Sequence, residues 1–255
     1  MRRYCSILVF AAVVFLLPSR VIGQAPDQPP QVQYIVDKPT AGMLPDRSYM
    51  LRGFAGAESS FLVGAAVGFK EVIQLGMSYG AQNVFDHGNP SANDYPGFQI
   101  RVRLIGEALR TPAIALGFDS QGRGVYHASL ERYDRKSTGF YAVASKNFAL
   151  ILGEVSLHGG VSWSTEQKDD RDPTLFAATE WLLFQRLSFL LAVDPAFNDN
   201  GSTSLGKGGF YIDAGVGWYF AEYANVTLTF RDLTENFGPV PDVSRELQVN
   251  LIKSF

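Results

Sequence analysis

Apolar and polar residues alternate in segment after segment of this 255-residue chain, and this period of two restricts the fold more than any other feature. In one segment Phe98, Ile100 and Val102 share one face, while Gln99 and Arg101 share the other. Successive side chains of a β-strand point to opposite faces, so each such segment predicts a strand with one apolar and one polar surface. The repetition predicts an all-β protein.

The connections between these segments distinguish two kinds of all-β protein. We expect about twelve strands, at 47–55, 60–69, 72–82, 97–106, 112–119, 138–147, 149–163, 174–183, 186–194, 209–219, 223–233 and 245–255. Short linkers (70–71, 107–111, Phe148, 184–185 and 220–222) alternate with long ones (83–96, 120–137, 164–173, 195–208 and 234–244). This alternation is typical of an up-and-down antiparallel transmembrane β-barrel, here spanning 47–255. A soluble β domain with its apolar face inward is the alternative.

The last expected strand carries a second indication of a membrane barrel. Leu247, Val249, Leu251 and Phe255 alternate along it and end on an aromatic residue, although Lys253 interrupts the series. An alternating strand that ends in this way is typical of the insertion signal of outer-membrane barrels. We therefore expect the protein in the cell outer membrane, with membrane lipids and the barrel-assembly machinery as its partners.

The amino terminus has the pattern of a cleaved secretion signal, expected at 1–23. Arg2 and Arg3 precede an apolar core at 7–17, and 21–23 offers a cleavage site. An uncleaved anchor is the alternative. The Pro-rich stretch 24–46 is expected to be an extended periplasmic tail, as a disordered spacer rather than a docking arm.

Loss of that signal changes the cysteine content and the charge of the chain. Cys5 would leave with it, so neither a disulfide nor thiol chemistry is expected. Loss of three arginines takes the formal charge from −3 to about −6, which argues against a nucleic-acid partner. We expect no cofactor.

Residues that could support catalysis are few. The three histidines are His87 and His127 in long loops and His158 in a strand, where it shares a face with Ser156 and Ser162. A hydroxyl with a base in reach could serve a lipid-cleaving enzyme. Such a site should face the bilayer, but the apolar residues of this strand occupy that side. We therefore expect a lumen histidine and a protein that is not an enzyme.

Acidic residues of two long loops are weak candidates for a Ca²⁺ site, because oxygen ligands suit that ion. They are Asp169, Asp170, Asp172 and Asp199. Their spacing is not that of an EF-hand loop, and Lys168 and Arg171 neutralise part of the charge. We expect solvated loop charges and no metal.

Polar side chains on the other face of the strands should line the lumen, since an Arg or Lys facing lipid costs about 2–4 kcal/mol. The candidates are Gln99, Arg101, Arg103, Lys146, Glu154, His158, Asp194, Asp213 and Arg231. We expect Arg101 and Arg103 to contact carboxylates, with Glu154, Asp194 and Asp213 as partners. Paired charges would plug the barrel, whereas separated charges would line a pore.

Four motifs at 39–45, 112–122, 139–147 and 157–161 occur in an order that resembles the YjbH-like group of outer-membrane β-barrel proteins. The resemblance covers nearly all of the chain after the signal. Better-known members of that group accompany exopolysaccharide secretion genes, so the resemblance implies a barrel that assists export or anchoring of a surface exopolysaccharide, together with polysaccharide-export components. A narrow passive channel for small solutes and a lipid-modifying barrel enzyme are the alternatives.

Overall fold

The computed structural model describes residues 31–56, 60–84, 90–93, 95–166, 170–201, 203–239 and 242–255. The expected signal peptide, the start of the Pro-rich stretch, His87 and Asp169 lie outside the described residues. Within the described part of the chain, no helix is long and apolar enough to cross a membrane.

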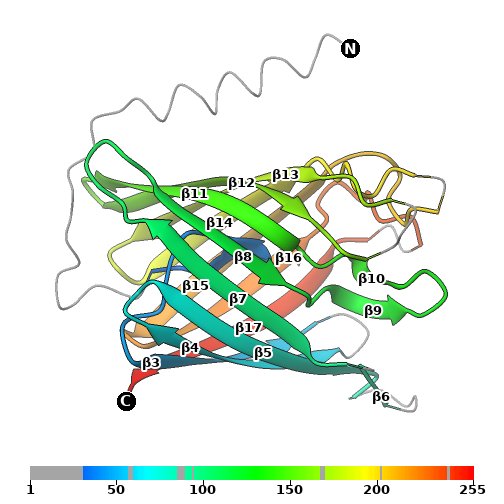
Figure 1. Cartoon of the computed structure of the whole chain (residues 1–255), viewed down its shortest axis with the longest axis horizontal. Coiled ribbons are helices and arrows are strands. Elements are labelled where there is room, and N and C mark those ends of the chain that lie inside the picture. Colours follow the sequence, from blue (N-terminus) through cyan, green and yellow to red (C-terminus); the bar gives the residue numbers. More distant parts are fainter. Residues whose placement is uncertain are drawn as a thin grey trace, which may run out of the picture.

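Twelve antiparallel strands close into a barrel (Figure 1). They are β3 (Ser48–Ala55), β4 (Phe61–Phe69), β5 (Ile73–Gln82), β7 (Gly97–Ile105), β8 (Ala113–Asp119), β11 (Gly139–Leu150), β12 (Gly153–Trp163), β13 (Thr174–Leu183), β14 (Leu187–Asp194), β15 (Tyr211–Ala221), β16 (Ala224–Arg231) and β17 (Ser244–Ser254). Each of these strands pairs with the next one, and β17 returns to pair with β3. The predicted up-and-down barrel is confirmed.

The long connections gather at one end of the barrel, and the short turns and the C-terminus lie at the other (Figure 1). The long-loop end also carries β6 (Ser91–Ala92) and the hairpin of β9 (Arg123–His127) and β10 (Arg132–Arg135). One expected turn is wrong: Phe148 lies within β11, and the chain turns at Ile151 and Leu152. Both turn residues are apolar and exposed, so the sequence carried no polar turn signal there.

The outer wall of the barrel is apolar and its inner wall is polar. Large apolar side chains are exposed on strands all around it, among them Leu51, Leu75, Phe98, Leu116, Phe140, Trp163, Trp181, Phe189, Trp218 and Leu228. The intervening residues are buried, and many are polar or charged. An apolar band around a polar interior is the arrangement of a membrane barrel, and the soluble alternative is wrong. The chain is an outer-membrane β-barrel, and Leu247, Val249 and Phe255 are exposed at its C-terminal strand.

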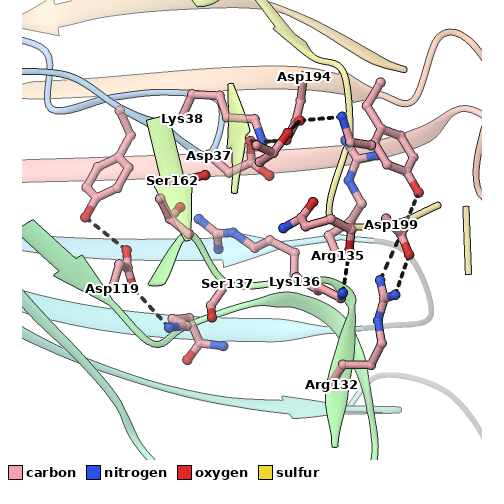
Figure 2. A pocket seen from close by; sticks show the side chains of 18 of the residues that line it. Asp37, Lys38, Asp119, Arg132, Arg135, Lys136, Ser137, Ser162, Asp194 and Asp199 are labelled. Carbon is pink, nitrogen blue, oxygen red and sulfur yellow. Dashed lines mark hydrogen bonds and ion pairs between the residues drawn. The ribbon is translucent and has the colours of Figure 1, made fainter. Parts of the chain in front are cut away.

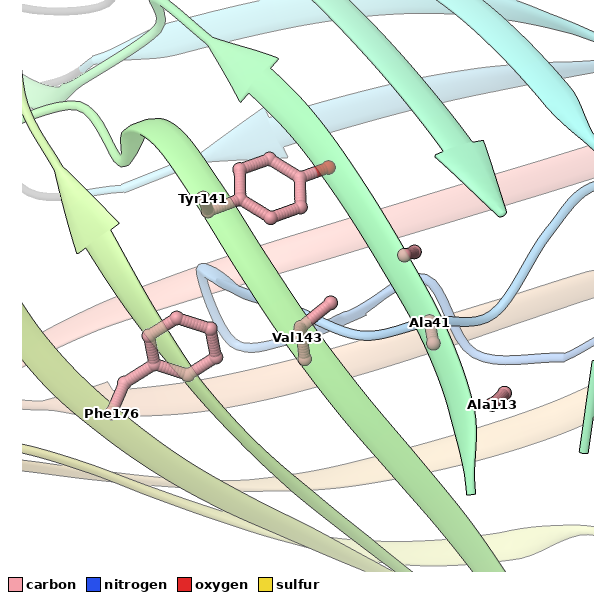
Figure 3. Close-up of a cluster of buried hydrophobic side chains, with 6 residues drawn as sticks. Ala41, Ala113, Tyr141, Val143 and Phe176 are labelled. Atoms are coloured by element: carbon pink, nitrogen blue, oxygen red, sulfur yellow. The ribbon is translucent and has the colours of Figure 1, made fainter. Parts of the chain in front are cut away.

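Residues 31–45 lie inside the barrel. They contain the short hairpin of β1 (Tyr34–Ile35) and β2 (Lys38–Pro39) and then follow an extended path. Ala41 packs in a buried cluster with the inner-face residues Ala113, Ala115, Tyr141, Val143 and Phe176 (Figure 3). The expected periplasmic tail is therefore wrong for this part of 24–46. Proline favours extended backbone as expected, but the polar inner wall supplies partners for that backbone. We call residues 31–45 the lumen segment.

Candidate functional site in the lumen

Two arginines of β7 hold the backbone of the lumen segment. Arg101 donates hydrogen bonds to the carbonyl oxygens of Gly42 (2.9 Å) and Gln33 (3.0 Å) and to the Tyr141 hydroxyl (2.9 Å). Arg103 donates to the carbonyl oxygen of Ala41 at 2.9 Å. Both side chains point into the lumen, as expected. The expected carboxylate partners are wrong, because the carbonyls of the lumen segment take their place.

Two guanidinium groups lie over the ring of Tyr34. Those of Arg52 and Arg101 are each 4.7 Å from its centroid, within the range of a cation–π contact. The Tyr34 hydroxyl donates to Asp119 on β8 at 3.0 Å. One aromatic side chain of the lumen segment thereby contacts residues of β3, β7 and β8.

Tyr34 also lines two small cavities. The outer cavity, toward the long loops, is lined by residues that include Asp37, Lys38, Arg135, Lys136 and Asp194 (Figure 2). The inner cavity is lined by residues that include Gln33, Met50, Tyr219, Asn225, Gln248 and Asn250. Tyr34 and Arg52 line both. Each cavity has a volume of about 50 Å³, which is room for a few water molecules. Residues of the lumen segment line both cavities.

Ion pairs surround the outer cavity. Lys38 of the lumen segment lies 2.5 Å from Asp194, which also accepts a hydrogen bond from Thr174 at 3.0 Å. Arg132 lies 2.5 Å from Asp199. Figure 2 shows the Lys38–Asp194 pair on one side of the cavity and the Arg132–Asp199 pair on another.

A further ion pair links the loop hairpin to the barrel wall. Arg135 of β10 binds both carboxylate oxygens of Asp213 at 3.0 Å, and its guanidinium stacks on Tyr211 at 3.4 Å. The β9–β10 hairpin is thereby held against the outer cavity.

Three further candidate lumen residues lie on the inner wall of the barrel. Gln99 accepts a hydrogen bond from Arg52 at 2.6 Å, and Glu154 lies half-buried on the inner face of β12. Arg231 contacts Asp37 (2.9 Å) and Glu246 (3.1 Å).

Lys146 is not a lumen residue. It stands opposite Leu157 in the sheet, on the outward side of β11, because its neighbour Ser145 faces inward. The β8–β11 pairing ends at Ser145, and the connection after β7 supplies the partners of the ammonium group. These are the carbonyl oxygen of Ala108 (2.5 Å) and Glu107 (3.2 Å).

His158 faces the lumen, and its Nδ1 lies 2.8 Å from the hydroxyl of Ser145. That hydroxyl also accepts the backbone N–H of Ala41 at 2.8 Å. Among the described residues His158 Nε2 has no hydrogen-bond partner. The partner serine is Ser145, neither Ser156 nor Ser162. A lipid-modifying site should face the bilayer, and this pair faces the lumen instead. His127 lies at the long-loop end and contacts Asp134 at 2.6 Å.

The loop acids are bound by protein groups. Asp170 accepts the backbone N–H groups of Asn200 (3.2 Å) and Gly201 (3.3 Å), and Lys136 lies 3.8 Å from it. Asp170 and Asp199 are buried, so the expectation of solvated charges is wrong for both, whereas Asp172 is exposed. Across the described ranges, no group of three His, Cys, Asp or Glu side chains is placed to hold a metal ion.

Several lumen-lining residues were missed from the sequence. Arg52 could have been found, because Met50, Arg52 and Phe54 alternate with the outward residues of β3. The missed residues of the lumen segment could not have been found, because a Pro-rich stretch does not specify what it packs against. The missed residues are Tyr34, Asp37, Lys38, Arg52, Arg123, Arg132 and Arg135.

No family model matches the sequence, and no curated protein matches it. Among solved structures the barrel is similar to the KdgM porin (10% identity, TM-score 0.46, 82% of this chain and 99% of that one). It is also similar to the NanC porin (9% identity, TM-score 0.48, 81% of this chain and 99% of that one). A third similar structure is Omp33 of Acinetobacter baumannii (8% identity, TM-score 0.43, 82% of this chain and 99% of that one). At these identities and TM-scores, the likeness does not indicate what this chain binds or transports.

Proposed function

We propose that the protein is a narrow passive channel for small solutes, which its own lumen segment holds closed. The supporting observation is that Tyr34 and Arg52 line both the outer and the inner cavity. Withdrawal of the side chain of Tyr34, the one residue of the lumen segment that lines both, would join the two cavities into a path along the barrel.

A role in exopolysaccharide export has less support than this channel. Cavities that hold a few water molecules cannot pass a polysaccharide chain while the lumen segment is in place. Membership of the YjbH-like group, with its envelope partners, stays a proposal that rests on the sequence motifs.

The channel is tested by fixing the lumen segment in place. The amide nitrogen of Ala41 lies 2.8 Å from the Ser145 hydroxyl, so Ala41→Cys and Ser145→Cys together should form a disulfide across this contact. In planar bilayers we expect the wild type to open briefly and the oxidised double variant to open at least about tenfold less often. A reducing agent should restore the openings.

The two single-cysteine variants are the matched controls, and their opening should not change on reduction. Openings that persist in the fully oxidised double variant would show that ions bypass the lumen segment. A protein that stays silent when reduced, and also with Tyr34→Ala, is a plugged structural barrel instead of a channel.

A further inference from the structure

The tip of the lumen-segment hairpin places a carboxylate among cations. Asp37 follows Val36, whose φ of +58° lies in the left-handed region that β-branched residues disfavour. Backbone in such a region costs about 1–3 kcal/mol and persists only where surrounding contacts impose it. The contacts of the barrel therefore hold this tip in its conformation.

One oxygen of the Asp37 carboxylate lies 2.9 Å from Arg231 of β16, and the other lies 4.0 Å from the ammonium of Lys38. Arg123 and Arg135 of the loop hairpin line the same cavity as Asp37. Within the described part of the chain, the second oxygen has no hydrogen-bond partner. The tip carboxylate thus meets four positive charges but makes one close guanidinium contact.

The cations around this tip are not all neutralised by the barrel. Lys38, Arg135 and Arg231 each contact a further carboxylate, those of Asp194, Asp213 and Glu246 respectively. Arg123 stacks on Phe54 at 3.9 Å, and among the residues that the structure describes no carboxylate lies within ion-pair distance of it. Burial, together with the charges of Arg231 and Arg52, lowers the pKa of Arg123 despite the opposing charge of Glu246.

Unused donors lie on the same wall. The described residues supply no hydrogen-bond partner for Arg52 Nε, Arg135 Nη1 or Arg231 Nε, although all three atoms are buried. A buried donor without a partner costs about 1–3 kcal/mol, and guanidinium groups match carboxylates well. The wall therefore has more capacity to bind an anion than Asp37 uses.

We infer that Asp37 is a tethered anion in a site for a small free carboxylate, formed by Arg231, Arg123 and Arg135. This inference rests on the proposed channel and names its substrate class. With the hairpin in place Asp37 occupies the site, so a free carboxylate binds only when the hairpin has left. A ligand that binds only the open state shifts the population toward that state. The solute would thus promote its own passage by displacing Asp37.

The test uses the full-length protein with gluconate as the probe and sorbitol as the uncharged control, at constant chloride. Gluconate should raise the open probability of the wild type about fivefold or more, and sorbitol should not. Asp37→Asn should raise the open probability without gluconate and reduce the response to it. Arg123→Gln should weaken the response. Asp46→Asn is the matched control, because that carboxylate accepts the backbone N–H of exposed Lys70 and should leave opening unchanged.

A second measurement does not depend on conductance. Gluconate should slow disulfide formation between Ala41→Cys and Ser145→Cys about fivefold, because it holds the lumen segment out. Equal effects of gluconate and sorbitol on both opening and disulfide formation, or an Asp37→Asn variant that behaves like the wild type, would overturn the inference and leave the channel intact. Silence of every variant, with disulfide formation still slowed by gluconate, would overturn the channel and retain the site.

Discussion

The carboxylate of Asp37 lies 2.9 Å from a guanidinium nitrogen of Arg231, although the two residues are 194 positions apart in the chain. Arg231 ends β16, and its other terminal nitrogen lies 3.1 Å from Glu246 of β17, the strand that closes the barrel against β3. One buried arginine therefore joins the lumen segment to the wall beside the closing strand.

Replacement of that arginine should affect both stability and closure. Arg231→Gln removes the closest cation of two partly buried carboxylates, Asp37 and Glu246, and breaking a fully buried pair in this way costs about 3–5 kcal/mol, which is the upper bound here. We expect the folded, faster-migrating form on unheated gels to convert at a clearly lower temperature. Arg47→Gln is the matched control, because its pair with Asp46 is exposed and long at 3.7 Å and should contribute little. Equal conversion temperatures would show that Arg231 does not hold the wall.

Removal of both arginines of β7 should loosen the lumen segment. Arg101→Ala with Arg103→Ala deletes the donors to the carbonyl oxygens of Gln33, Ala41 and Gly42. Hydrogen bonds from charged donors contribute about 1.5–3 kcal/mol each, so the segment should leave the lumen more often. We expect greater uptake of small antibiotics by cells that carry the double variant. Unchanged susceptibility and unchanged conductance would mean that these arginines do not retain the segment.

The aromatic ring of Tyr34 is expected to be the barrier between the cavities. Tyr34→Ala should join them and raise the conductance, because the ring lines both cavities. Tyr34→Phe keeps the ring and loses only the hydrogen bond to Asp119, so it should conduct like the wild type. If both variants open equally, the hydrogen bond and not the ring closes the path.

Lys136 predicts a pH dependence of stability. It lies in the connection between β10 and β11, where burial and the charge of Arg132 lower its pKa to about 8. The unfolded chain has the ordinary lysine pKa of about 10.4. Between these values the unfolded state binds more protons, so the free energy of unfolding should rise as pH increases from about 8. Unfolding temperatures should show this gain in the wild type relative to Lys136→Gln. If the difference in unfolding temperature between the wild type and Lys136→Gln does not change with pH, the lowered pKa of Lys136 is contradicted.

The barrel could be predicted from sequence because its determinants are local. Alternation sets which face each residue takes, and the twelve expected strands lie within a few residues of the observed ones except around Phe148. Lys146 was misplaced because the apolar residues Tyr141 and Val143, on the opposite face of β11, pack inside the barrel with Ala41 and do not face the lipid.

The position of the lumen segment could not be predicted, because it depends on contacts between distant residues. Tyr34 meets Asp119 85 positions away, and Lys38 meets Asp194 156 positions away. The partners of Arg101 depend on how far the strands are staggered around the barrel, which a single sequence does not fix. A proline-rich stretch has the same composition whether it lies in a lumen or in solution.

Disulfide formation in native outer membranes tests the central claim most directly. In a Cys5→Ser background, Ala41→Cys with Ser145→Cys should cross-link on mild oxidation and change gel mobility, because the two residues are in contact inside the barrel. Ala41→Cys with Leu116→Cys is the control, since Leu116 is exposed on the outer wall and should not react. Rapid cross-linking of the first pair alone is the predicted result. No cross-link in the first pair, with Ala41→Cys freely labelled by a water-soluble thiol reagent, would show that residues 31–45 lie outside the lumen.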